Sequence, residues 1–274
     1  MCNKQFIGGE RLNNLRIWQE YTEGKQTYKQ LAAKYNCSVK TIQRKIDSVK
    51  IEPKKTFPCV VNVLMDTTYF GRTFGVMVFK DSLSKTILHK QYVKTETNNL
   101  YLQGIETIVQ RGIKVQAIIC DGRKGVLQLF GDIPVQYCNF HQVKTIRTYL
   151  TKNPKLQASK DLWELTLMLS RTDKESFTGG LNLWYTKWNV FLNEQKEDEN
   201  GKKRYVHKRL RSAYRSLKTN LPWLFTWYDY PELNIPNTTN AIDGHFADLK
   251  NKLRNHNGLS EVRKKRFIDE FFKA

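Results

Sequence analysis

The chain has 274 residues, with 46 Lys and Arg against 26 Asp and Glu, and its formal net charge of +20 accompanies a pI near 9.7. An excess of this size predicts a polyanionic partner, nucleic acid first. A membrane partner is excluded as an interpretation, because neither an amphipathic anchor nor a run of about 18 apolar residues is found. The start MCNKQF lacks the order of a signal peptide, so we expect a cytoplasmic protein with reduced cysteines.

The first 51 residues predict a small helical domain. Apolar residues at helical spacing favour helices over residues 12–21, 27–35 and 38–48. Within residues 10–51, QLAAKYNCSVKTIQRKI is typical of a helix-turn-helix, in which Asn36 and Cys37 form the turn and Ser38 caps the next helix. The polar face of that helix offers phosphate-binding and base-reading residue types: Lys40, Thr41, Gln43, Arg44 and Lys45. The alternative is a purely structural bundle with a solvated face.

A linker over residues 52–58 separates these helices from a segment rich in buried-looking strands. Strands are predicted over residues 59–70, 71–81, 85–93, 115–122 and 134–141, with a helix over residues 98–110 and a short one before the fifth strand. The order strand, strand, strand, helix, strand, helix, strand is that of the RNase H-like fold. We therefore predict an α/β protein with a mixed sheet.

The rest of the chain has helical periodicity. Residues 142–236 predict an all-helical insertion, interrupted by a polar loop over residues 194–203. The last predicted element, a helix over residues 239–254, returns to the sheet, so residues 59–141 and 237–274 together form the predicted catalytic core.

Two strand-end acids indicate metal chemistry. Asp66 is predicted to close the first strand of the core and Asp121 the fourth, so both carboxylates should project from the same ends of adjacent strands. The best third acid is Asp243, with Asn240 one turn before it and Lys250 two turns after it on the same helix face. Two Mg²⁺ or Mn²⁺ ions about 4 Å apart would offset the repulsion and activate the attacking oxygen.

Each acid also has a structural interpretation. A strand-end Asp commonly caps the following turn, and Asp243 would stabilise the first turn of its helix through the helix dipole. The other candidates for the third acid are Asp248, Glu232 and Glu261.

The motifs DTTYF, ICDGRKG, YCNFHQVK and NTTNAIDGHFADLKNKLRNHNGLS resemble bacterial DDE transposases of the IS256 and Mutator-like group, in the branch with an N-terminal zinc-binding segment, over roughly residues 10 to 265. The resemblance implies an RNase H-like core in which two Asp and a terminal Glu bind the metals. Asp66 and Asp121 match the two Asp. Asp243 stands where the family usually has Glu, which leaves an inactive copy as an alternative.

Two further features follow from the resemblance. Cys138 and His141 match a Cys-x-x-His signature of the group, and we interpret them as local structure or, for His141, as a phosphate neighbour; a packed Cys and a hydrogen-bonded His is the alternative. Residues 1–9 resemble the second half of a zinc ribbon. With Cys2 alone this site cannot form, which suggests a truncated element or a start placed downstream.

The helical insertion contains a basic run from Lys202 to Lys218, which predicts contact with the DNA backbone. The residues we assign to that contact are Lys203, Arg204, Lys208, Arg209 and Arg211. The Trp residues of the insertion are assigned to packing.

The predicted function is metal-dependent cleavage and transfer of DNA strands at the ends of an insertion sequence. The expected partners are double-stranded DNA in the bacterial nucleoid and a second copy of the chain, in a dimer or a higher oligomer, because two ends must be handled together. The rival interpretations are a catalytically inactive or domesticated DNA-binding protein and an RNase H-like nuclease that only hydrolyses.

Overall fold

The computed structural model describes residues 12–50, 56–256 and 258–273. By their contacts these residues form two compact units, one from residues 12–50 with residues 244–256 and 258–273, and one from residues 56–243. The zinc-ribbon remnant predicted at residues 1–9 lies outside the described residues. Among those described, no helix is both long and apolar enough to cross a membrane.

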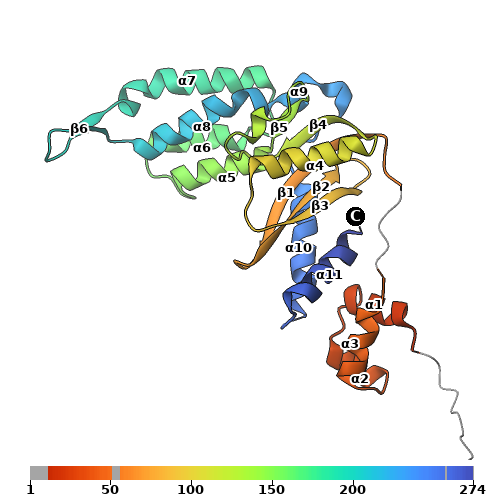
Figure 1. Cartoon of the computed structure of the whole chain (residues 1–274). Coiled ribbons are helices and arrows are strands. Elements are labelled where there is room, and N and C mark those ends of the chain that lie inside the picture. Colours follow the sequence, from red (N-terminus) through yellow and green to blue (C-terminus); the bar gives the residue numbers. More distant parts are fainter. Residues whose placement is uncertain (1–11, 51–55, 257, 274) are drawn as a thin grey trace, which may run out of the picture. The chain divides into compact units, whose positions relative to one another are not determined.

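The larger unit contains a five-stranded mixed sheet (Figure 1). Its strands are β1 (Val60–Phe70), β2 (Phe74–Asp81), β3 (Ile87–Val93), β4 (Lys114–Cys120) and β5 (Val135–Tyr137). Their order is β3-β2-β1-β4-β5, in which the β1–β2 and β2–β3 pairs are antiparallel and the β1–β4 and β4–β5 pairs are parallel. This is the RNase H-like topology, and the predicted fold class is confirmed.

The helix α4 (Asn98–Gln110) connects β3 to β4 and packs on the sheet. Every residue of β2 is buried, as expected for a strand with neighbours on both sides and covered faces. Tyr101 of α4 packs against Phe79 of β2 with ring centroids 6.5 Å apart. A Cβ at Gly104 would lie 1.9 Å from Cζ of Phe79, so the helix approaches the strand as closely as it does because this position has no side chain.

The close approach at Gly104 predicts that alanine at this helix position destabilises the fold, the opposite of its usual effect in a helix. Gly to Ala inside a helix normally stabilises by about 1 kcal/mol, but at Gly104 the added methyl overpacks the core, which typically costs about 1 to 3 kcal/mol. We expect Gly104→Ala to lower the free energy of unfolding measured with urea. The matched control is Gly179→Ala in α7 (Lys174–Leu192), where a Cβ meets no atom within 4 Å and the substitution should stabilise.

Helices follow the last strand of the sheet and gather beside it (Figure 1). They are α5 (Asn139–Leu150), α6 (Gln157–Leu167), α7, α8 (Lys208–Leu224) and α9 (Thr226–Asp229), with the short helices η1 (Val126–Gln128) and η2 (Pro231–Leu233) nearby in sequence. One prediction for this region was wrong. The expected polar loop at residues 194–203 is a hairpin of β6 (Gln195–Glu197) and β7 (Lys203–Tyr205), because Asp198 accepts backbone hydrogen bonds from Asn200 and Lys202 and closes the turn.

The smaller unit contains α1 (Asn14–Thr22), α2 (Tyr28–Lys34) and α3 (Val39–Asp47), close to the three predicted helices. Asn36 takes a positive φ of 46° in the turn before α3, and Ser38 caps α3 by accepting the backbone N–H of Thr41 at 3.1 Å. These are the turn and cap residues that the helix-turn-helix pattern predicts.

The end of the chain groups with this smaller unit, whereas we predicted that residues 237–274 belong to the catalytic core. The helix α10 (Asn240–Arg254) starts in the larger unit, but its residues from Gly244 onward and α11 (Glu261–Phe272), a helix we did not predict, group with α1–α3. Asp47 accepts a hydrogen bond from Arg263 at 2.9 Å, and Tyr21 packs against His256 and Phe267. These long-range contacts cannot be read from local periodicity.

Candidate active site

Asp66 and Asp121 lie side by side by strand register. The last residue pair between the parallel strands β1 and β4 is Leu64 with Ile119, and each Asp is two residues beyond that pair. Residues two apart on a strand share a face, so the two carboxylates project from the same edge region of the sheet. We predicted that Asp66 closes its strand. It does not, because β1 continues to Phe70 in antiparallel pairing with β2.

Asp243 reaches the same region from α10. It lies in the first turn of the helix, where the Thr239 hydroxyl donates to its Oδ2 at 3.1 Å. Ile242 beside it is fully buried. The Nζ of Lys80, on β2, donates to the Ala241 carbonyl at 3.1 Å and fixes this turn against the sheet.

Electrostatics link the three acids. Burial is the largest cause that raises the pKa of Asp66, the charges of Asp243 and then Asp121 raise it too, and a backbone hydrogen bond from Thr67 lowers it, so that the net pKa is about 7. A carboxylate whose pKa responds to two others lies in a locally negative environment. The structure therefore brings the three predicted acids within electrostatic reach of one another.

Cys138 and His141 connect α5 to this cluster. The Thr239 hydroxyl lies 3.3 Å from Cys138 Sγ and 3.4 Å from His141 Nδ1 while also contacting Asp243. The hydrogen bond with Cys138 is the largest cause that raises the pKa of His141, burial lowers it, and Asp66 and Asp243 add to the rise, so that the net pKa is about 9. Burial raises the pKa of the Cys138 thiol, but hydrogen bonds from His141 and Thr239 outweigh it and the net shift is downward.

This upward shift favours the protonated form of His141, near Asp66 and Asp243. The Cys-x-x-His pair and Thr239 form a small polar network behind Asp243. Its position fits both of the interpretations that the sequence left open, local structure and a neighbour of a bound phosphate.

A fourth acid, Glu96, lies near Asp121 and was missed by sequence reasoning. Burial raises its pKa, with Asp121 as the next cause. It accepts a hydrogen bond from the Tyr101 hydroxyl at 3.3 Å and pairs with Arg123 at 3.7 Å. Glu96 lies outside any regular element, just before α4, so neither strand alternation nor helical spacing marks it.

Glu96 and Asp121 line an open pocket of about 420 Å³. Its other lining residues include the cations Arg123, Lys144 and His141. Positive side chains beside a carboxylate cluster suit a phosphodiester approaching the acids. Lys144 follows His141 by one helical turn of α5, a spacing that sequence reasoning had available but did not use.

Gly122 explains how the chain turns at Asp121. A Cβ there would lie 2.2 Å from Cζ of Tyr137, whose side chain is buried. The strand β4 therefore passes into its loop against the Tyr137 ring, and this contact fixes the backbone next to Asp121.

The predicted DNA-binding residues lie on separate surfaces. In α3, Lys40 and Arg44 are exposed, and the others are partly exposed: Thr41, Gln43 and Lys45. In the helical region Lys208 and Arg209 are exposed in the first turn of α8, and Lys203 is exposed on β7.

Two of the predicted DNA contacts are already engaged within the chain, and two further predicted residues lie on α10. Arg204 pairs with Asp198 at 2.6 Å, and Arg211 lies over the ring of Tyr205, 3.5 Å from its centroid. Asn240 is exposed at the start of α10, and Lys250 is partly exposed in the part of α10 that groups with α1–α3.

Within the described residues, no three His, Cys, Asp or Glu side chains form a ready-made cluster for a metal ion. Oxygens of the three acids are partly engaged by the chain itself. Asp66 Oδ1 accepts from Thr67 N at 2.7 Å and Asp121 Oδ1 from Arg123 N at 3.4 Å.

No known protein family model and no curated protein matches the chain. Among solved structures it is similar to a chain in the cryo-EM structure of the simian T-cell lymphotropic virus intasome in complex with PP2A regulatory subunit B56 gamma. That match has 12% sequence identity and a TM-score of 0.24, and it covers 73% of this chain and 68% of the other. The fold assignment rests on the sheet topology and not on this match.

Proposed function

We propose that the chain is a DNA transposase that cleaves and transfers DNA strands. The observation that carries the proposal is the electrostatic interaction of Asp66 with Asp243 and Asp121 at one edge region of an RNase H-like sheet. The fold alone does not assign a reaction. Three interacting acids beside a pocket with a cationic rim support phosphodiester chemistry over a purely structural role.

The donor chemistry of the site fits divalent cations. Mg²⁺ and Mn²⁺ take oxygen ligands, and the pKa of Asp66 is raised by burial first and then by the negative charges of Asp243 and Asp121, which a cation would neutralise. Asp66, Asp121 and Asp243 would hold the ions, two in number. When bound, such ions activate a water or a 3′-hydroxyl and stabilise the leaving oxygen.

The residues around the acids would handle the phosphate. Arg123 and Lys144 line the pocket beside Asp121, where they can attract and orient the DNA backbone. The raised pKa of His141 favours a positive charge near Asp66 and Asp243. The hydroxyl of Thr239 orients Asp243.

The finer assignment to the Mutator-like group of DDE transposases rests on the motifs. Asp243 replaces the Glu expected there, and the first turn of α10 holds its shorter carboxylate close enough to raise the pKa of Asp66. This supports an active enzyme with three Asp over a decayed copy. Recognition of the DNA ends is assigned to α3, and we expect at least a dimer to join two ends.

The direct test uses the purified chain, Mg²⁺ or Mn²⁺, a DNA fragment that borders its gene, and a supercoiled target plasmid. We expect cleavage at the element end and covalent joining to the plasmid. Cleavage without joining would support the nuclease alternative. Binding without either reaction would support the inactive DNA-binding alternative.

End recognition by α3 predicts a sequence-specific loss of affinity. Arg44→Ala or Lys45→Ala should weaken binding to the border DNA by roughly 5- to 150-fold, since a base-reading contact is worth about 1 to 3 kcal/mol. Binding to random DNA should change much less, as measured by fluorescence anisotropy. Lys114→Ala, an exposed cation at the start of β4, serves as the control for loss of charge alone. Equal losses on both DNAs would refute the recognition-helix assignment.

A further inference from the structure

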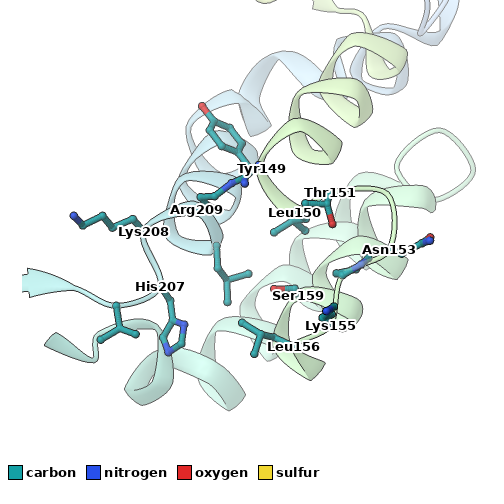
Figure 2. A pocket seen from close by; sticks show the side chains of 13 residues that line it. Tyr149, Leu150, Thr151, Asn153, Lys155, Leu156, Ser159, His207, Lys208 and Arg209 are labelled. Atoms are coloured by element: carbon teal, nitrogen blue, oxygen red, sulfur yellow. The ribbon is translucent and has the colours of Figure 1, made fainter. Parts of the chain in front are cut away.

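A second pocket of about 420 Å³ lies among α5, α6 and α8 in the helical region (Figure 2). Apolar side chains line much of it: Leu150, Leu156, Val206 and Leu210. Figure 2 shows Leu150, Leu156 and Ser159 turned toward its middle, with Lys208 extending outward at the edge. Lys155 and Arg209 complete the basic lining, and Arg209 donates to the Thr148 carbonyl at 2.5 Å.

The walls of this pocket come from two stretches of chain without a single acidic residue. Residues 133–160 contain the cations Lys144, Arg147, Lys152, Lys155 and Lys160. Residues 200–228 contain Lys202, Lys203, Arg204, Lys208, Arg209, Arg211, Arg215 and Lys218. A concave site between two such stretches selects an anion. A site for phosphate alone would not need the apolar side chains that line this pocket, so they indicate a ligand with an apolar part as well.

At several positions around the pocket, other residue types would give a more stable helix end or backbone conformation. Leu156 is the N-cap of α6, where Ser or Asp is preferred, yet it is a Leu that is 46% exposed. Lys208 and Arg209 occupy the first turn of α8, which favours acids. Thr151 is β-branched and has a φ of 72° and a ψ of 175°, a region that glycine favours. Residues that break local rules together around one cavity indicate a functional site.

We propose that this pocket binds an unpaired nucleotide of a DNA strand. The base would lie against Leu150 and Leu156, and the phosphate beside Lys155 and Arg209. A pocket of this volume is in the range of small-ligand sites, and apolar contact with a base together with cations on the backbone is how proteins hold single strands. The inference deepens the proposed function, since a cleaved DNA end supplies unpaired nucleotides.

The test measures binding in EDTA, so that it is independent of catalysis and of metal. The probes are a blunt 25-base-pair duplex and the same duplex with a four-nucleotide 3′ extension that contains 2-aminopurine. We expect the extended probe to bind roughly fivefold or more tightly, in line with about 1 to 3 kcal/mol per contacted base, and the 2-aminopurine fluorescence to change on binding.

Two variants test whether this pocket causes the preference for the extended probe over the blunt probe. Leu156→Ser removes the apolar contact while supplying a favourable N-cap, so the fold is retained, and it should reduce the preference to less than about twofold. Lys155→Ala should weaken binding of the extended probe more than binding of the blunt probe. The matched controls are Leu183→Ser, an exposed Leu on α7, and Lys114→Ala, and both should keep the preference.

Three results would overturn the inference. These are equal affinity for both probes, a preference that Leu156→Ser leaves unchanged, and competition by a free mononucleotide as effective as by the extended DNA. The last result would reassign the pocket to a small nucleotide ligand. None of the three bears on strand cleavage at Asp66, which the cleavage assay tests separately.

Discussion

Asp66→Ala or Asp121→Ala is expected to lower the rate of DNA strand cleavage by more than about 100-fold, while DNA affinity stays within about twofold. Loss of a residue that only supports a metal ligand costs about 10- to 100-fold, and loss of a ligand itself should exceed that. Binding should survive because it depends on cations elsewhere in the chain, and removing a negative charge does not weaken attraction to DNA. Cleavage of labelled border DNA and anisotropy with the same DNA give the two readouts.

The same experiment tests whether Asp243 is the third acid of the active site. Asp243→Asn should match Asp66→Ala in the cleavage assay, whereas Glu96→Gln should lose less, because Glu96 already pairs with Arg123 and Tyr101. Asp132→Asn, an exposed acid in the same unit, is the control for a changed carboxylate. If Asp66→Ala lost DNA binding in parallel with cleavage, the separation of chemistry from binding would be wrong.

The sheet was predictable because its strands carry strong local signals. β1, β2 and β4 are nearly continuous apolar runs bounded by turn residues, and their order along the chain already implies the topology. The ends of strands are less well marked. Asp66 follows an apolar run and looks like a strand end, but pairing of Thr67 and Thr68 with β2 extends the strand past it.

The acids of the site were predictable for the same reason, since strand order alone places Asp66 and Asp121 on neighbouring strands. Glu96, Arg123 and Lys144 were not, because tertiary packing brings them from a loop, a turn and a helix face to the pocket beside Asp121. The grouping of α11 with α1–α3 depends on Arg263 with Asp47, a pair 216 residues apart. No local pattern encodes such a contact.

The raised pKa of Asp66 predicts a pH-dependent stability with a definite sign. Asp in an unfolded chain ionises near pH ~4, while burial and then Asp243 and Asp121 raise the pKa of Asp66 in the folded chain to about 7. Between these values the folded chain holds a proton that the unfolded chain has released, so this residue makes stability fall as pH rises from about 4 to about 7. Above pH 7 the folded state bears the full cost of the buried charge.

Asp66→Asn cannot ionise and should therefore be more stable than the native chain at pH 8 in EDTA, by on the order of 2 kcal/mol once partial exposure is allowed for. At pH 5.5 the two proteins should differ by about half as much, because the unfolded chain has already released its proton at this pH while the folded chain has not. Thermal unfolding across this pH range measures the effect, with Asp132→Asn as a control that should follow the native chain. An unchanged difference between pH 5.5 and 8 would mean that Asp66 is ionised throughout.

Divalent cations should reverse this destabilisation in the native chain. An ion held by Asp66, Asp121 and Asp243 stabilises the folded state by mass action, by roughly 2.7 kcal/mol at a hundred times its dissociation constant. We expect Mg²⁺ to raise the melting temperature at pH 8 more than at pH 5.5, where the protonated Asp66 is a poorer ligand, and to act little on Asp66→Asn. An equal rise in the native chain and in Asp66→Asn would place the ion elsewhere. Because this readout needs no DNA, it separates metal binding by the three acids from every later step of the proposed reaction.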